Sequence, residues 1–345
     1  MEAVTGSTCL PMAEDVVWIR VEEAAEAGRV RRAATTLAEK LAFPATRVAE
    51  IGVAVTEIAT NLHKHAREGV VLVRSVRGGT HAAVEVLAVD GGPGITDVSL
   101  AFEDGQSTTG TLGVGLGAVV RLSDSCDMAS RPGHGTVLAA RFHARRGPVA
   151  DLPEDVAAGI TRAIGGEEVC GDAYAVRRAP GRLTMMMCDG SGHGPLAATA
   201  SQAAVRLFCE LDPTAPEDVV ARIHRELRGT RGGAVAVADV DLVARTVRYA
   251  GLGNIAGAVL GDGQKRGMIS VPGVAGYQAR TIRAFDYPLP DDATVVMHSD
   301  GLTERWAVER GDTILTSTPL VVAGALLRDA GVRKDDACVL VGKAS

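Results

Sequence analysis

Four aspartates at the ends of short apolar runs give this sequence its clearest chemistry. They are Asp172 in "CGDAY", Asp189 in "MMMCDGSGHGP", Asp300 in "HSDGLTE" and Asp335 in "RKDDACVLV". Carboxylates and a backbone carbonyl can hold two Mn²⁺ or Mg²⁺ ions while a bridging water is deprotonated and attacks phosphorus. A phosphate-cradling loop needs a lysine, which residues 190–196 lack. A single Asp-Gly pair is more often a β-turn, but four such positions favour a metal site.

A second group of residues with chemical potential lies in the first half of the chain. Glu57 and Asn61 are four residues apart in a predicted helix and therefore lie on one face. A carboxylate beside an amide oxygen suits the orientation of a nucleophile and the binding of Mg²⁺. Asp90 ends a strand in "VDGGPGI", where a buried carboxylate can accept a hydrogen bond from an exocyclic amine. Gly92 and Gly94 let the backbone approach a flat ligand closely.

A glycine-rich stretch, "STTGTLGVGLGAVVRL", follows and leads into a predicted helix. It places Gly113, Gly115 and Gly117 where free backbone N–H groups and the helix dipole favour phosphate. Alone, such a loop is more often a connector than a nucleotide site. The order of the three motifs, from Glu57 to Gly117, favours a nucleotide site.

The elements that must position these residues fall into two groups. Helices are expected at 22–41 and 44–66, and strands at 70–76, 82–90 and 135–142, which predicts an α+β layer with helices on one face of a mostly antiparallel sheet. Charge, proline and glycine cluster at 144–155 and indicate a linker. Beyond it, short strands with helices at about 195–211, 215–228 and 319–330 predict an αββα sandwich. The predicted domains are 1–146 and 156–345, joined by a linker at 147–155.

The composition of the 345 residues restricts the partners and the compartment. A net charge of −6 and 3% aromatic residues provide no basic stacking surface, which argues against nucleic acid. The N-terminus has acids where a secretory signal has basic residues, and no uncharged apolar run is long enough to span a bilayer. We therefore expect a cytoplasmic protein with no membrane partner. Its six cysteines include no C-x-x-C pair and are expected to be free thiols.

The motifs of the first half resemble those of the GHKL (Bergerat-type) ATPase fold. "TEIATNLHKHA", "DGGPGI" and "GTLGVGLGAVVRLSD" are most similar to the RsbT-type serine/threonine switch-protein kinases, over about residues 15–143. The resemblance implies that Asp90 recognises the adenine of ATP and that Asn61 holds its Mg²⁺. Glu57 then acts as a base or orients the substrate hydroxyl. The glycines at 92, 94, 113, 115 and 117 surround the nucleotide, and no phospho-accepting histidine is implied.

The motifs of the second half resemble the SpoIIE-type branch of metal-dependent serine/threonine phosphatases, over about 156–343. "GDAY", "DGSGHG", "GLGN" and "SDGLTE" occur in family order, whereas "DDAC" departs from the usual D-D-M/I-T. The resemblance implies that Asp189 bridges two Mn²⁺ or Mg²⁺ ions and that the Gly190 carbonyl assists. The same resemblance assigns Asp172, Asp300 and Asp335 to the remaining protein ligands.

Several positions near this metal site stay open. Asp336 is a less secure ligand, and His193 either donates a proton to the leaving hydroxyl or hydrogen-bonds within its loop. The Gly251–Asn254 turn is interpreted as structural. Three cysteines near the ligands are expected to be small buried hydrophobes, with sensitivity to oxidants as the alternative: Cys170, Cys188 and Cys338.

Together the resemblances imply a bifunctional signalling enzyme of bacterial partner switching. It would phosphorylate and dephosphorylate a serine or threonine of a STAS-type switch or stressosome protein, with an RsbT-like kinase half and an RsbX-like phosphatase half. The main alternative is a phosphatase regulated by a non-catalytic nucleotide-sensing module. A broad small-molecule phosphatase is a third possibility. Kinase-like domains of this family often pair, so a homodimer stays open.

Overall fold

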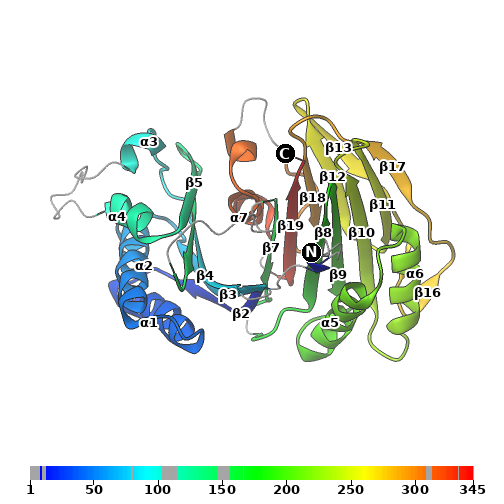
Figure 1. The fold of residues 1–345 in the computed structure, drawn as a ribbon, viewed down its shortest axis with the longest axis horizontal. Coiled ribbons are helices and arrows are strands. Elements are labelled where there is room, and N and C mark those ends of the chain that lie inside the picture. Colours follow the sequence, from blue (N-terminus) through cyan, green and yellow to red (C-terminus); the bar gives the residue numbers. More distant parts are fainter. Residues whose placement is uncertain are drawn as a thin grey trace, which may run out of the picture. The chain divides into compact units, whose positions relative to one another are not determined.

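A computed structural model of the chain describes residues 8–9, 13–78, 81–102, 115–145, 156–165, 167–307, 313–332 and 334–344. The chain forms two compact units. One comprises Pro11–Asp151 and Thr313–Arg328, and the other comprises Met1–Leu10, Leu152–Asp312 and Asp329–Ser345. Figure 1 shows the elements of each unit.

The first unit is a five-stranded antiparallel sheet with the helices α1, α2 and α4 on one face (Figure 1). Its strand order is β2-β3-β4-β6-β5. The helices α1 and α2 pack against each other and onto β4, and α2 also contacts α4. The bounds of these elements are β2 (Ala13–Arg20), α1 (Ala24–Lys40), α2 (Ala45–His65), β3 (Val70–Gly78), β4 (His81–Val89), α3 (Val98–Ala101), α4 (Gly115–Leu122), β5 (Ser125–Arg131) and β6 (Gly135–His143).

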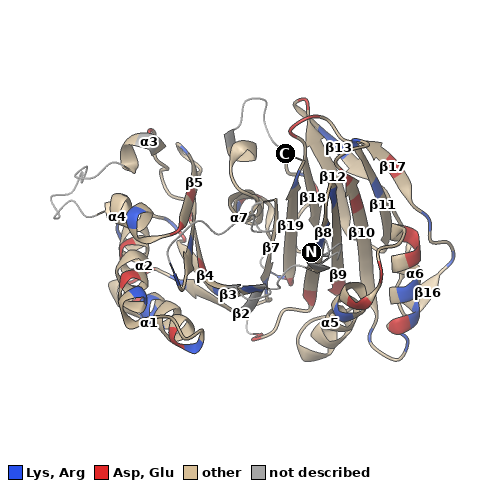
Figure 2. Cartoon of the chain, in the orientation of Figure 1, with Lys and Arg blue, Asp and Glu red and all other residues tan. Residues whose placement is uncertain are grey.

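Apolar periodicity explains why these helices cover the sheet. The buried residues of α1 are Val30, Ala34, Leu37 and Ala38, which recur with the helical period on one face. They form one core with alternate residues of the central strands, because side chains at every second strand position point to the same face. Charged residues of both signs lie along α1 outside this core (Figure 2).

A helix from near the C-terminus also belongs to the first unit. The 3-10 helix η2 (Thr313–Thr316) precedes α7 (Pro319–Ala330). A Cβ built on Gly324 of α7 would lie 2.9 Å from Val137 Cγ1 and 3.2 Å from Leu87 Cδ2. Both the backbone N–H and the hydroxyl of Thr318 donate to Asp127 Oδ2, at 2.7 and 2.8 Å. The sequence predicts this helix correctly but groups it with the C-terminal half.

The second unit contains two sheets. One has the order β1-β8-β9-β10-β11-β14, with β17 also paired to β11, and the other has the order β13-β12-β18-β19-β7. Strands β15 and β16 form a separate hairpin. The strand bounds are β1 (Thr8–Cys9), β7 (Ala157–Arg162), β8 (Asp172–Ala179), β9 (Arg182–Gly190), β10 (Gly233–Asp241), β11 (Thr246–Leu252), β12 (Ala256–Gly261), β13 (Gln264–Met268), β14 (Ser270–Val271), β15 (Gly273–Val274), β16 (Gln278–Ala279), β17 (Phe285–Pro288), β18 (Thr294–His298) and β19 (Ala337–Lys343).

Both sheets of the second unit contribute to a single core. Met185 and Met187 of β9 join Met297 of β18 and Leu340 of β19 in one buried cluster. The methionines at 185–187 are fully buried, as expected for strand packing. Helices α5 (Pro195–Glu210) and α6 (Pro216–Glu226) pack on the first of the two sheets. The predicted α+β fold, an antiparallel sheet covered by helices followed by a sandwich of two sheets with outer helices, is confirmed.

The expectation that all six cysteines are free is wrong for one pair. Cys9 and Cys209 form a disulfide between the segment paired with β8 and helix α5. Their separation of 200 residues explains why no local spacing pattern revealed it. The other four cysteines are free, and Cys188 and Cys338 are fully buried. Burial raises the pKa of the Cys170, Cys188 and Cys338 thiols, which makes them poor nucleophiles.

No helix in the described part of the chain has both the length and the apolar composition required to cross a bilayer.

Candidate active sites

Asp172 and Asp189 face each other across two neighbouring strands. Asp172 begins β8, Asp189 lies near the end of β9, and the antiparallel register pairs them directly. Side chains paired in this way have Cβ atoms about 5 Å apart on one face of the sheet. Gly190 follows Asp189, and a Cβ at Gly190 would overlap the carbonyl oxygen of Ala197. Only glycine therefore fits at this position.

Asp300 and Asp335 come from the second sheet. Asp300 follows β18 and Asp335 precedes β19, and these two strands are paired. The amide of Asn254 donates to Asp300 Oδ2 at 2.7 Å. The Gly251–Asn254 turn, interpreted from the sequence as structural, thus supplies a hydrogen bond to a proposed metal ligand. Sequence reasoning missed this residue, which is remote from Asp300 in the chain.

Burial and mutual repulsion dominate the electrostatics of this cluster. Burial, followed by neighbouring carboxylates, raises the pKa of Asp172 to about 7 and that of Asp189 to about 9. The pKa of Asp300 is also raised, first by burial and then by Asp335. The neighbouring charges with the largest effect on these three pKa values are carboxylates. The cluster is therefore unfavourable when it is ionised without cations.

The chemistry of the cluster fits hard divalent cations. Asp172 Oδ2 is buried and has no hydrogen-bond partner among the described residues. A cavity of about 590 Å³ opens beside Asp189, Asp300 and Asp335. Within the described ranges, no three His, Cys, Asp or Glu side chains are close enough to enclose an ion by themselves. Water and substrate oxygens would complete each shell, as is usual for Mg²⁺.

The two open positions near the cluster have partners of their own. Both carboxylate oxygens of Asp336 accept backbone N–H groups, from Ile164 at 2.6 Å and from Gly171 at 2.7 Å. Asp336 therefore holds the segment that contains Ile164 and Gly171 in place next to Asp335. His193 Nδ1 lies 2.8 Å from Glu167 Oε1, so its hydrogen bond reaches a different segment from its own loop.

In the first unit, Asp90 is held rigidly at the end of β4. It is buried, its Oδ1 accepts the Gly92 N–H at 2.6 Å, and its own N–H donates to Thr136 O at 2.9 Å. Burial raises the pKa of Asp90, while the Gly92 hydrogen bond and the charge of Arg328 lower it. No described residue donates a hydrogen bond to Oδ2, so this oxygen is available to a ligand amine.

The glycines around Asp90 are required by close backbone contacts. Gly94 has φ +73°, and a Cβ there would overlap the carbonyl oxygen of Arg131. Gly92 approaches the backbone of His65, at 3.0 Å from a built Cβ. Gly115 and Gly117 begin α4, whereas Gly113 lies outside the described residues.

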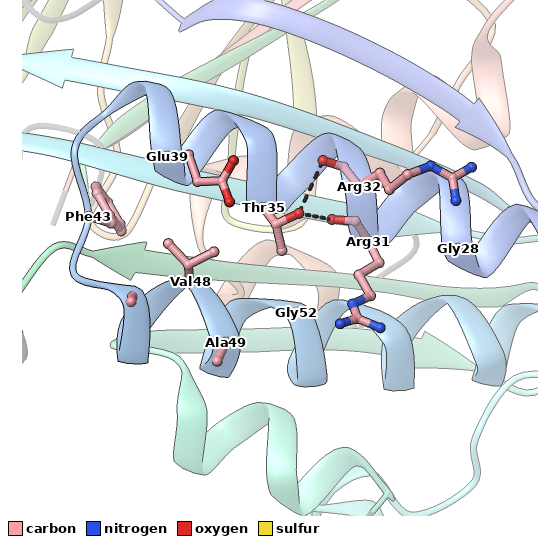
Figure 3. A pocket seen from close by; sticks show the side chains of 10 residues that line it. Gly28, Arg31, Arg32, Thr35, Glu39, Phe43, Val48, Ala49 and Gly52 are labelled. Atoms are coloured by element: carbon pink, nitrogen blue, oxygen red, sulfur yellow. Dashed lines mark hydrogen bonds between the residues drawn. The ribbon is translucent and has the colours of Figure 1, made fainter.

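Glu57 and Asn61 are half-buried on α2, one turn apart. A groove of about 630 Å³ runs between α1 and α2 and is lined by Arg31, Thr35, Val48 and Gly52 among others (Figure 3). Arg31 extends across it toward Gly52 (Figure 3). Asn61 lies about half a turn around α2 from Gly52, so the groove is on the opposite side of the helix from the proposed nucleotide ligands.

Comparisons with known proteins agree with the division of the chain into an N-terminal and a C-terminal domain. Residues 21–142 match the family described as the histidine kinase-like ATPase domain, and residues 179–344 match stage II sporulation protein E (SpoIIE). Serine/threonine-protein kinase RsbT of Bacillus subtilis (strain 168) is 36% identical over 110 residues, which cover 32% of this chain and 83% of RsbT.

Two solved structures illustrate the similarity. A chain from a study of the bacterial stressosome is 31% identical with a TM-score of 0.50, and the match covers 54% of this chain and 97% of that chain. RsbX in complex with magnesium is 18% identical with a TM-score of 0.45, covering 54% and 94%. The chain thus belongs to the RsbT family through its histidine kinase-like ATPase domain and carries a SpoIIE-type phosphatase domain behind it, a combination that fits partner-switching signalling.

Proposed function

We propose that this chain is a bifunctional enzyme that phosphorylates and dephosphorylates a serine or threonine of a STAS-type switch or stressosome protein. The kinase domain comprises 1–146 and uses ATP with Mg²⁺. The phosphatase domain comprises 156–345 except for Thr313–Arg328, which belongs to the first unit; it follows a linker at 147–155 and uses two Mn²⁺ or Mg²⁺ ions. The similarity to RsbT and to SpoIIE supports the two activities.

The pairing of Asp172 with Asp189 is the observation that carries the phosphatase half of the proposal. Asp172 and Asp189 stand in direct cross-strand register, and burial, followed by repulsion from neighbouring carboxylates, raises both of their pKa values. Bound divalent ions would relieve this repulsion and supply an activated water for attack on the phosphoester. The side chains hold and orient these ions, with the Gly190 carbonyl as a neutral ligand. Asn254 fixes Asp300 for the same purpose.

The kinase half of the proposal assigns separate tasks to three side chains. Asp90 accepts a hydrogen bond from the exocyclic amine of adenine, because its other oxygen is already held by Gly92. Asn61 contributes an oxygen to Mg²⁺. Glu57, one turn earlier on α2, takes the proton from the substrate hydroxyl or orients it toward the γ-phosphoryl group.

Intact-mass spectrometry of a purified STAS-domain protein tests both halves. The partner is incubated with the chain and Mg-ATP, desalted, and then given fresh chain with Mn²⁺ alone. We expect a gain of one phosphoryl group that requires Glu57, and then a loss that requires Asp189. The variants Glu57→Ala and Asp189→Asn run in parallel, and each serves as the control for the other activity.

The two halves fail independently in this experiment. If no phosphoryl group is gained with ATP, but a partner phosphorylated by another kinase loses its phosphate, the first half senses nucleotide without transfer. If the phosphorylated partner keeps its phosphate in the presence of Mn²⁺, the phosphatase assignment is wrong.

A further inference from the structure

Arg231 lies beside the metal pocket and has no partner in the described part of the chain. The side chain is exposed and makes no ion pair or hydrogen bond with any described residue. A Cβ built on Gly192 would lie 3.0 Å from Arg231 Nη1. Gly192, which has φ +88°, lines the pocket together with Asp189. The guanidinium group therefore rests on the loop that follows the central aspartate.

The turn that carries Arg231 is fixed on both sides. Gly232 N–H donates to the Thr230 hydroxyl at 2.9 Å, and the Tyr277 hydroxyl donates to Thr230 O at 2.8 Å. The Gly232 carbonyl accepts the backbone N–H of Ser191 at 3.0 Å. The backbone of this arginine is thus anchored to the pocket loop, and its side chain projects from a rigid base.

The pocket itself has no cationic wall. The described residues that line it include three aspartates, several glycines, Ser191 and Asn254, but no lysine or arginine. Among the described residues, Arg231 forms no ion pair with the aspartates that line the pocket, so it is not their counter-ion. An arginine held at the edge of an acidic pocket without neutralising it is available to an anion that enters the pocket.

We propose that Arg231 binds the phosphoryl group of the phosphatase substrate and holds it over the metal pocket. This inference rests on the phosphatase half of the proposed function. A guanidinium group presents a planar fork of donors that matches two oxygens of a phosphate monoester. Metal ions in the pocket would contact the phosphoryl oxygens from the carboxylate side, and Arg231 contacts them from the Gly192 side. The group it recognises is the phosphoryl group itself and not a side chain of the substrate protein.

Steady-state kinetics of the Mn²⁺-loaded full chain test this assignment with two substrates. p-Nitrophenyl phosphate offers only the phosphoryl group, whereas a phosphoserine peptide with acidic neighbours also offers carboxylates. For Arg231→Ala we expect KM to rise on the order of tenfold or more for both substrates, since a charge-assisted hydrogen bond is lost. Arg231→Lys should recover part of the loss, because lysine keeps the charge but not the fork. Arg222→Ala, an exposed arginine on α6, is the matched control and should leave KM unchanged.

A binding measurement complements the kinetics. Isothermal titration of inorganic phosphate into the Mn²⁺-loaded protein should show a weakening in Arg231→Ala comparable to the change in KM. If wild type hydrolyses both substrates and Arg231→Ala has the same KM and phosphate affinity, the inference is wrong while the phosphatase assignment stands. A loss confined to the acidic peptide would also overturn it, because Arg231 would then bind carboxylates. If Arg222→Ala raises KM and weakens phosphate binding equally, the effect comes from the net charge of the protein and the inference is wrong. Absence of hydrolysis by the wild-type chain would instead refute the proposed function.

Discussion

In the proposed phosphatase site, protons would compete with metal ions for the carboxylates, and the raised pKa values indicate the extent of this competition. Without metal, burial and the neighbouring carboxylates raise the pKa of Asp172 to about 7 and that of Asp189 to about 9. Below pH 7, binding of metal must therefore release about two protons, and between pH 7 and 9 about one. The apparent affinity for Mn²⁺ should accordingly rise about 100-fold per pH unit below pH 7 and about tenfold per unit above it.

The same shifts determine the stability of the metal-free protein. Both folded-state pKa values lie above those of the unfolded chain, so the folded state binds more protons between about pH 4 and pH 9. The free energy of unfolding should fall as pH rises through this window, and saturating Mn²⁺ should remove the fall. In Asp189→Asn the pH dependence should be smaller, because one of the interacting charges is absent.

Calorimetric titration with Mn²⁺ at pH 6, 7 and 8, in two buffers of different ionisation enthalpy, counts the released protons. Urea denaturation of EDTA-treated protein over the same range measures stability. Asp262→Asn, an exposed turn residue in the same unit, is the control and should retain the wild-type pH dependence. An affinity for Mn²⁺ that does not change between pH 6 and 8 would refute the electrostatic account of the cluster.

Two further predictions concern residues that support the sites. Asn254→Ala leaves Asp300 without its amide donor, and we expect the affinity for Mn²⁺ to fall about 10-fold or more. If calorimetry gives the wild-type affinity, Asn254 does not support metal binding through Asp300. Cys209→Ser removes the cross-link to Cys9 and should lower the free energy of unfolding by about 2–4 kcal/mol. Wild type in dithiothreitol should show the same loss in urea denaturation, and a midpoint insensitive to reductant would mean that this disulfide does not form in solution.

The regular elements were largely predictable because their signals are local. Prolines at the first turns of α5 and α6 mark where these helices begin, and the apolar period follows. The strand β5 was missed because it lies at the edge of its sheet, pairs only with β6, and is mostly half-buried. Its residues therefore lack the apolar alternation that identifies a central strand.

The partners of the site residues were harder to predict because they depend on tertiary contacts. Motif order indicated the four aspartates, but not that Asp172 and Asp189 are in direct register. Asn254 reaches Asp300 across 46 residues, and nothing in the sequence near either residue specifies that hydrogen bond. Asp336 stands next to Asp335 in the chain, yet its oxygens are occupied by backbone N–H groups. Only the fold distinguishes the two neighbours.

For helix α7, too, the sequence does not specify the tertiary contacts, in this case those of a whole element. Its residues are apolar on nearly every side, so the sequence predicts burial but does not specify which sheet covers it. Gly324 is the position that reveals the packing, since a Cβ there would meet Val137 at 2.9 Å. At a solvent-exposed position inside a helix, Gly→Ala raises the free energy of unfolding by up to about 1 kcal/mol. At Gly324 the added methyl must displace a branched, stiff side chain, which typically costs about 1–3 kcal/mol.

Two alanine substitutions in the first unit are therefore expected to change the free energy of unfolding in opposite directions. Gly324→Ala should lower the free energy of unfolding measured in urea. Gly28→Ala in α1 should raise it, because the nearest atom to its built Cβ is the end of the Arg32 side chain at 3.4 Å. Gly324→Val should lower it further than Gly324→Ala. If both alanine variants were stabilised alike, α7 would not pack closely on the sheet, and the assignment of this helix to the nucleotide-binding unit would have to be abandoned.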